Sequence, residues 1–258
     1  MVILKGHPSI PNVDAWGRSQ YYEYLTMQLL DPTLAHSVRQ GKRLDIPSAA
    51  CAAEQLVDVL SHMRGRSIIQ CDIKPNNMLF GTENDSDRVY LVDFGFASYY
   101  RDPTTLVHRP METNVKDDIE SLAYVFLELV QGTLPLENRH DRVLIQQEKE
   151  AWTGAELAVG VPSVFGEFID YARTLEYTEE PDYFRWRTAF RELDGCSGQP
   201  VVEQTDARHF DERVHGPRTR FSRDYEEGFQ VRQQRRLDPY VYVAGLRRRV
   251  SPGAAYWG

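Results

Sequence analysis

The sequence predicts an α+β fold with a short strand-rich beginning, a mainly helical body and a disordered tail. Three observations lead to this prediction. Short apolar segments separated by proline, glycine and serine open the chain, helical apolar periodicity dominates residues 31–194, and no sustained period follows Asp194. With 258 residues, 41% of them hydrophobic, the chain is long enough to bury a sizeable core.

Residues 1–30 are expected to form strands joined by turns. Apolar segments at 2–4, 15–16 and 22–30 alternate with Pro8, Pro11 and Gly17, which are typical turn residues. We therefore treat residues 1–30 as a partial β-rich lobe.

The helical body begins with a segment that Asp45 is expected to cap and Gly65 to end, with Pro47 in its first turn. Residues 118–130 are apolar on most faces, which predicts a buried central helix. Asp118 is expected to cap that helix. Two amphipathic helices with aromatic stripes follow at 165–175 and 183–193.

The most informative stretch runs from residue 67 to residue 100. Asp72 is followed by Lys74 two positions on and by Asn77 five positions on, and Asp93 stands directly before Phe-Gly. Phosphoryl transfer needs a carboxylate to orient the attacking hydroxyl and hard oxygen ligands for Mg²⁺. Asp72 suits the first role, Asn77 and Asp93 suit the second, and Lys74 would offset charge on the transferring phosphate.

Each half of this pattern has a purely structural interpretation. Asp-Phe-Gly alone usually marks a turn, and Asp72 with Asn77 could cap a loop. The two halves in this order, joined by the apolar segments 78–80 and 89–92 around a polar turn, instead predict a hairpin that places the two acids together. The combination indicates a kinase-type phosphotransferase.

With these motifs the chain resembles the casein kinase 1 family of eukaryotic protein kinases. The resemblance rests on Gln-Cys-Asp-Ile-Lys-Pro-Asn-Asn at 70–77, Asp-Phe-Gly-Phe-Ala-Ser-Tyr-Tyr-Arg-Asp at 93–102, and Lys-Asp-Asp-Ile-Glu-Ser-Leu-Ala-Tyr-Val-Phe at 116–126. Three further stretches, at 29–34, 131–135 and 160–183, agree, and the order is collinear from about residue 5 to residue 193.

The resemblance implies a protein kinase-like fold and a Ser/Thr protein kinase that uses ATP and Mg²⁺. Residues 1–30 would be the remnant of the N-terminal lobe with the hinge strand, 31–194 the C-terminal lobe, and 195–258 an Arg-rich tail. The residues implied at the nucleotide site are Met27 (gatekeeper), Gln28 and Leu30 (hinge backbone), Leu79 and Val92 (apolar contacts), Asn77 and Asp93 (metal), and Asp72 and Lys74 (catalysis). The resemblance also implies that Asp118 holds the loop around Asp72 by hydrogen bonds.

The chain departs from the family in ways that point to a truncated and degenerate member. No Gly-x-Gly-x-x-Gly and no Val-Ala-Ile-Lys-like strand precede the hinge, and Gln70-Cys71 replaces the usual His-Arg. Only 24 residues separate Asp93 from Asp118, and the substrate-platform stretch lacks a counterpart, although Arg101, His108 and Arg109 could contact anions. Either the product is incomplete or half of the small lobe was lost.

Three function classes are therefore considered for this chain. The first is an impaired casein-kinase-1-like protein kinase, and the second is a catalytically dead pseudokinase that acts as a scaffold. The third is a small-molecule phosphotransferase of the aminoglycoside-kinase kind, against which Lys74-Pro75 and the downstream stretches count.

Composition limits the location and the partners. Three widely spaced cysteines, with no long apolar run and no secretory signal, predict reduced thiols inside the cell, in the cytoplasm or nucleus, without membrane insertion. The net charge is −8, yet residues 195–258 contain eleven arginines and eight acids. Because those acids would repel phosphate, nucleic-acid binding is not expected. The resemblance implies a protein substrate or protein partner, and we expect a monomer.

Overall fold

The computed structural model describes residues 2–18, 20, 22–39, 43–82, 85–109, 114–132, 134, 147, 149, 151–194 and 242–247. The chain divides into two compact units, one made of residues 1–11 and 30–202 and the other of residues 12–29 and 203–258. In the described parts, helices dominate the first unit and short strands make up the second. The expected α+β class is therefore confirmed.

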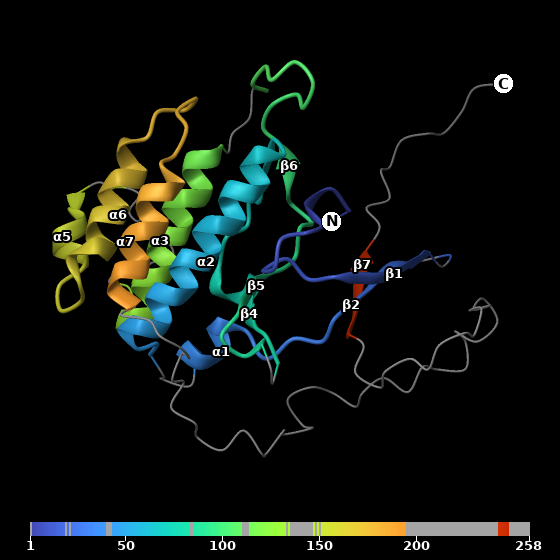
Figure 1. The fold of residues 1–258 in the computed structure, drawn as a ribbon, viewed down its shortest axis with the longest axis horizontal. Helices are drawn as coiled ribbons and strands as arrows, with labels where there is room; N and C mark the ends of the chain where they lie inside the picture. Colours follow the sequence, from blue (N-terminus) through green and yellow to red (C-terminus); the bar gives the residue numbers. More distant parts are fainter. Residues whose placement is uncertain are drawn as a thin grey trace. The chain divides into compact units, whose positions relative to one another are not determined.

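The first unit is a bundle of helices with two small strand pairs. Its elements are η1 (Val2–Leu4), α1 (Leu34–Arg39), α2 (Ile46–Gly65), β3 (Ile68–Ile69), η2 (Pro75–Asn77), β4 (Met78–Phe80), β5 (Val89–Leu91), β6 (Ser98–Tyr99), α3 (Val115–Gln131), α5 (Gly154–Leu157), α6 (Ser163–Thr174) and α7 (Tyr183–Asp194). Helix α2 packs against α3 and α7, and α6 packs against α3 and α5 (Figure 1). No helix among the described residues combines the length and the apolar character needed to cross a membrane.

Helix α3 is the centre of this bundle, as its almost unbroken apolar sequence predicts. Leu122, Phe126 and Leu129 are fully buried, and the Phe126 ring lies 6.0 Å from the Phe190 ring of α7. The aromatic stripes of α6 and α7 also face this core, with Phe165, Phe168, Trp186 and Phe190 almost completely buried. Their interpretation as core helices is confirmed.

The expected N-cap of α3 is wrong. The helix begins one turn earlier than predicted, at Val115, and Asn114 caps it by accepting a hydrogen bond from the Lys116 N–H (2.7 Å). Asp117 completes a capping box by accepting from the Asn114 N–H (2.7 Å). The pattern Asn114 followed three residues later by an acid was the signal in the sequence. Asp118 is left for another role.

Helix α2 begins as predicted. Asp45 accepts a hydrogen bond from the Ser48 N–H at 2.7 Å, and proline occupies the first turn. The buried face of α2 includes Ala53, Leu56 and Leu60. Helix α2 contacts β3, the short strand directly before the loop that carries Asp72.

We expect Asp45→Ala to lower the free energy of unfolding by about 1 kcal/mol, because the first turn of α2 would lose its side-chain acceptor. Asp45→Asn keeps an oxygen at the same place and should lose only a fraction of that. Urea unfolding followed by circular dichroism measures both. Equal losses in the two variants would show that the cap is not what stabilises this end of the helix.

Residues 2–4 form a 3-10 turn and not the expected strand. The carbonyl oxygens of this turn bind side chains of the α2 region, with Arg66 Nε donating to Ile3 O (2.9 Å) and His62 Nε2 donating to Leu4 O (3.0 Å). Leu4 is buried in the helical core. The apolar character of this segment therefore reflects packing against α2.

The second unit contains one antiparallel sheet in the order β1 (Val13–Arg18), β2 (Tyr22–Met27) and β7 (Tyr242–Arg247). The strands β1 and β2 are as predicted, with Trp16 paired to Leu25. Strand β7 corrects the expectation of disorder for residues 242–247. A six-residue run without proline suffices to pair with the second edge of β2, although it is too short to give a periodic signal. The rest of the predicted tail, residues 195–241 and 248–258, lies outside the described residues.

Candidate functional site

The loop from residue 70 to residue 77, called here the Asp72 loop, holds its acid by two side-chain donors. Lys74 Nζ lies 2.7 Å from Asp72 Oδ2, and Asn77 Nδ2 donates to the same oxygen at 2.9 Å. Asn77 Nδ2 also lies 2.9 Å from the Asp72 backbone carbonyl. The carboxylate is therefore fixed in direction, with an ammonium group beside it.

A hairpin brings the second acid to this loop. The predicted strands pair as β4 and β5, with Met78 opposite Leu91. Immediately after β5, the Val92 N–H donates to the Asn77 carbonyl at 2.9 Å. This bond places Asp93, the next residue, beside the end of the Asp72 loop. The predicted hairpin is confirmed, and the residue before Asp93 is bonded to the end of the Asp72 loop.

Asp93 begins a tight turn with an unusual backbone. Its φ is +57°, in the left-handed region that residues with a Cβ seldom adopt. The Gly95 N–H lies 3.3 Å from Asp93 Oδ1, and a side chain at position 95 would come within 3.1 Å of that oxygen. Glycine at 95 therefore leaves room for the exposed Asp93 carboxylate.

The oxygen ligands at this place fit Mg²⁺ in type. Asp93 supplies a carboxylate and Asn77 an amide oxygen, since its amide nitrogen already faces Asp72. Mg²⁺ typically takes one or two protein oxygens and completes its shell with water and substrate phosphates. Within the described ranges no group of three or more His, Cys, Asp or Glu side chains gathers to hold a metal. The donor set therefore suits a metal ion shared with a phosphate ligand.

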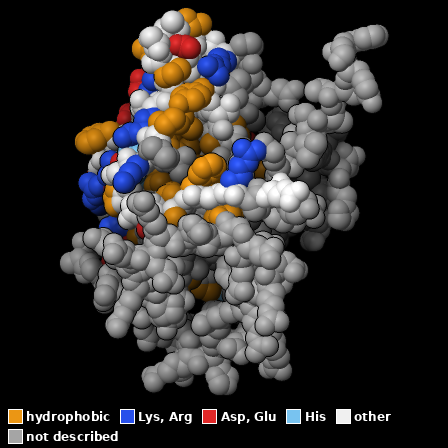
Figure 2. Space-filling view, turned by 90° about the vertical axis from the view of Figure 1, so that its right-hand side faces the viewer, with side chains coloured by type: hydrophobic (Ala, Val, Ile, Leu, Met, Phe, Trp, Pro, Cys, Tyr) orange, Lys and Arg blue, Asp and Glu red, His pale blue; other side chains and the backbone are white. Residues whose placement is uncertain are grey.

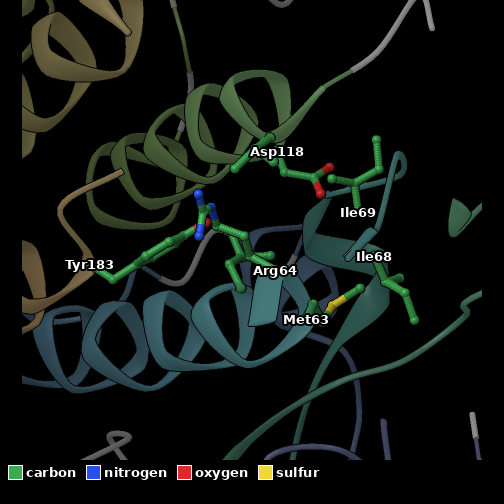
Figure 3. A pocket seen from close by; sticks show the side chains of 8 residues that line it. Met63, Arg64, Ile68, Ile69, Asp118 and Tyr183 are labelled. Atoms are coloured by element: carbon green, nitrogen blue, oxygen red, sulfur yellow. The ribbon is translucent and has the colours of Figure 1, made fainter. Parts of the chain in front are cut away.

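The side chain of Asp118 binds the backbone of the Asp72 loop. Its carboxylate is buried, and it accepts the Gln70 N–H at 2.6 Å and the Cys71 N–H at 2.9 Å. Figure 3 shows this side chain reaching from α3 toward the chain that follows Ile69. The predicted hydrogen bonds from Asp118 to the loop are confirmed.

Burial dominates the electrostatics of this anchor. It raises the pKa of the Asp118 carboxyl from 3.8 to about 7, although the two N–H bonds from the loop act in the opposite direction. A small buried pocket adjoins the carboxyl, and Met63, Arg64, Ile68 and Tyr183 are among the residues that line it (Figure 3). Burial likewise raises the pKa of the Tyr183 hydroxyl. The pocket lies between α2, α3 and α7, within the core beneath the loop.

The residues predicted to contact the nucleotide base fall into both units. Leu79 lies on β4 and Val92 directly follows β5, both partly exposed, and Leu30 belongs to the same unit. An isolated bridge between Thr33 and Leu79 holds the segment after Leu30 against β4. The structure thus places Leu79 and Val92 on the hairpin that carries Asp93.

Met27 and Gln28 belong to the second unit. Met27 is the last residue of β2 and is buried, and Gln28 donates its N–H to the Asn12 carbonyl at 3.3 Å. The Gln28 side-chain oxygen accepts the Asn12 N–H at 3.1 Å. Their part in a nucleotide site stays a prediction.

The three predicted anion contacts, Arg101, His108 and Arg109, pack on tyrosine rings. The Arg101 guanidinium lies 5.2 Å from the Tyr100 ring centre, and that of Arg109 lies 5.7 Å from the Tyr99 ring centre. The His108 ring stands edge-on to Tyr100. Figure 2 likewise shows Lys and Arg side chains interspersed with hydrophobic ones on the described part of one face. These ring contacts lie in the segment after β6, and contact of the three side chains with anions stays a prediction.

Comparisons with known families and proteins show the family to which the chain is similar. The protein kinase domain family matches residues 1–163, which include Asp72, Asn77 and Asp93. The chain is 32% identical over 226 residues to casein kinase I homolog 2 of Schizosaccharomyces pombe, covering 76% of this chain and 52% of that protein.

Two further relatives give the same result. Casein kinase I homolog 3 of Schizosaccharomyces pombe is 34% identical over 224 residues, which cover 74% of this chain and 50% of that protein. Casein kinase I homolog 2 of Saccharomyces cerevisiae is 29% identical over 234 residues, which cover 79% and 43%. The chain spans about half the length of the relatives that it matches.

Proposed function

The chain belongs to the protein kinase family as a casein-kinase-1-like member, and from this premise we propose that it binds Mg-ATP and directs the γ-phosphate to serine or threonine hydroxyls of a protein. The observation that carries the proposal is the oriented carboxylate of Asp72, held by Lys74 and Asn77 next to the turn of Asp93. Phosphoryl transfer depends mainly on positioning and charge stabilisation, which these side chains can supply.

Each residue of the proposed site has a distinct role. Asp72 orients the substrate hydroxyl and accepts its proton. Lys74, 2.7 Å from Asp72 in the free chain, turns toward the transferring phosphate and offsets its charge. Asn77 and Asp93 would hold Mg²⁺, which supplies charge neutralisation to the phosphates when bound. Leu30, Leu79 and Val92 are the proposed contacts for the adenine ring.

For this chain on its own we propose slow transfer. The chain has side chains suited to the base and metal-ligand roles, whereas the 258 residues contain no Gly-x-Gly-x-x-Gly to cover the phosphates. Transfer needs the γ-phosphate held in line with the hydroxyl, and loose positioning can remove several kcal/mol of transition-state stabilisation. The same asymmetry favours a second candidate function, a nucleotide-binding scaffold without turnover.

Titration with a fluorescent ATP analogue, with and without Mg²⁺, tests the proposal. Mg²⁺ should strengthen binding at least about tenfold in the wild-type chain, and Asp93→Ala should abolish that gain because a carboxylate ligand is lost. A casein phosphorylation assay run in parallel should give slow turnover that Asp72→Ala removes. Asp87→Ala is the matched control, since Asp87 is an exposed acid in the turn of the same hairpin.

The outcomes separate the candidates. Absence of nucleotide binding, or a gain from Mg²⁺ that survives Asp93→Ala, contradicts the proposed site. Mg²⁺-dependent nucleotide binding without phosphorylation of casein supports the scaffold function. Fast phosphorylation that Asp72→Ala abolishes supports an unimpaired protein kinase.

We propose the cytoplasm or nucleus as the place of action and a protein as the substrate or partner. The three cysteines are widely spaced and include no Cys-x-x-Cys, a pattern that supports a reducing compartment.

A further inference from the structure

Two histidines, His7 and His62, lie against each other where residues 2–10 pack on α2. Their ring centres are 4.9 Å apart, and one ring stands edge-on to the other. The His7 side chain is buried and that of His62 is partly buried. Histidine changes its charge between pH 5 and pH 8, so acid would place two like charges side by side in a poorly hydrated position.

His7 is held as the neutral ring by a donor at one nitrogen and an acceptor at the other. The Ser9 N–H can only donate, and its nitrogen lies 3.1 Å from His7 Nδ1, so Nδ1 accepts this bond. The ring proton is therefore on Nε2, which donates to Asp58 Oδ2 at 3.2 Å. A second proton would have to go onto Nδ1, where it breaks the bond to Ser9.

His62 is held in the same tautomer. Its Nε2 lies 3.0 Å from Leu4 O, which can only accept, and its Nδ1 lies 3.0 Å from Arg66 Nη1, which can only donate. Nε2 therefore carries the proton and Nδ1 accepts from the guanidinium. A second proton on Nδ1 would remove that bond and set an imidazolium against the Arg66 cation.

The charged groups around the pair also act on its protonation. Asp58 favours the charged form of His7, but the other oxygen of this carboxylate lies 2.6 Å from Arg187 Nη1. Arg187 opposes a charge on His7, and Arg66 opposes one on His62. Burial has the largest effect and lowers the pKa of both rings below the ordinary value of 6.5.

The bonds of the two rings fix a segment that contacts the catalytic hairpin as well as α2. The Ser9 carbonyl accepts the Leu91 N–H of β5 at 3.0 Å, and Leu4 is buried in the helical core. The Ile10 N–H donates to the His7 carbonyl at 3.1 Å. Loss of the histidine bonds would therefore loosen residues 2–10 on both α2 and β5.

We propose that His7 and His62 form a pH-dependent switch, closed while both rings are neutral and opened by acid, which releases residues 2–10 from α2 and β5. Once released, the rings regain water and bind protons more readily than in the closed form, so the closed form gains stability as the pH rises. Its contribution is complete above pH 6.5 and is lost as the pH falls from there through the lowered pKa values. The switch does not depend on the proposed nucleotide site.

Hydrogen exchange at pH 8 and at pH 5 measures the opening, with each rate compared with that of an unstructured peptide at the same pH. We expect the protection of the Ser9, Ile10 and Leu91 amides to fall at least about tenfold at pH 5, as the loss of a buried hydrogen bond implies. The amides of α6 should keep their protection, because α6 packs on α3 and α5.

The double variant His7→Asn/His62→Gln should remove the response to pH. The Asn oxygen can accept the Ser9 N–H in place of Nδ1, and the Gln nitrogen can donate to Leu4 O in place of Nε2, but neither amide titrates. Protection at Ser9 and Leu91 should then be equal at pH 5 and pH 8. The matched control is His36→Gln, which removes a histidine from α1 and should keep the wild-type response.

Three results would overturn the switch. They are unchanged protection of the wild-type amides at pH 5, a loss of the same size in the double variant, and an equal loss in α6. Should the double variant not fold, NMR titration of the ring C–H signals decides in the wild-type chain: both rings must become charged below pH 6.5 in step with the loss of protection. Asp118 cannot cause that loss, because its raised pKa makes acid stabilise the folded chain.

Discussion

Phe126→Asp is expected to unfold the helical body at room temperature. Phe126 is fully buried on α3 and lies against Phe190 of α7. The substitution removes an aromatic side chain from a packed core, which costs about 3–5 kcal/mol, and buries a carboxylate without a partner, which adds several more. Domains of this size are stable by about 5–15 kcal/mol. Circular dichroism should therefore show loss of the cooperative melting transition.

Phe184→Asp is the matched control for this experiment. Phe184 lies on α7 in the same bundle, but 83% of its surface is exposed. The same chemical change there should shift the melting temperature by only a few degrees, because little apolar burial is lost. A cooperative wild-type transition in Phe126→Asp, or equal damage from both variants, would mean that α3 is not the centre of the core.

The helical body could be predicted because its signals are local or periodic. Asp45 and Pro47 marked the start of α2, and the continuous apolar run marked α3 as the buried helix. The predictions failed where an apolar segment is too short to have a period. Residues 2–4 are apolar and residues 242–247 mostly so, but only their partners, α2 for the first and β2 for the second, decide between turn, strand and disorder.

The candidate site residues could be named from the sequence, whereas their backbone conformation could not. The spacing of Asp72, Asn77 and Asp93 indicates a kinase-type site, and the predicted hairpin joins the segments that carry Asn77 and Asp93. No sequence pattern specified the left-handed conformation of Asp93 or the hydrogen bond from the Gln70 side chain to the Asp93 carbonyl. Those features depend on long-range contacts, because the two residues are 23 positions apart.

The buried carboxyl of Asp118 makes stability depend on pH in a defined direction. Its pKa is raised by burial to about 7 in the folded chain, whereas an unfolded aspartate has its ordinary value of 3.8. Between these values the folded chain holds a proton that the unfolded chain has released. The contribution of Asp118 to stability is therefore complete below about pH 4 and is lost as the pH rises through 7. A shift of about three units corresponds to about 4 kcal/mol.

Asp118→Asn should remove this pH dependence, because an amide does not titrate. The wild-type free energy of unfolding, measured by urea denaturation from pH 4 to pH 8, should fall relative to that of the variant by up to about 4 kcal/mol. His7, whose pKa burial lowers, contributes an opposite slope to both chains and cancels in the difference. Asp87→Asn, at an exposed acid, should keep the wild-type profile. Parallel profiles for wild type and Asp118→Asn would mean that Asp118 is ionised throughout, and that its bonds to Gln70 and Cys71 outweigh its burial.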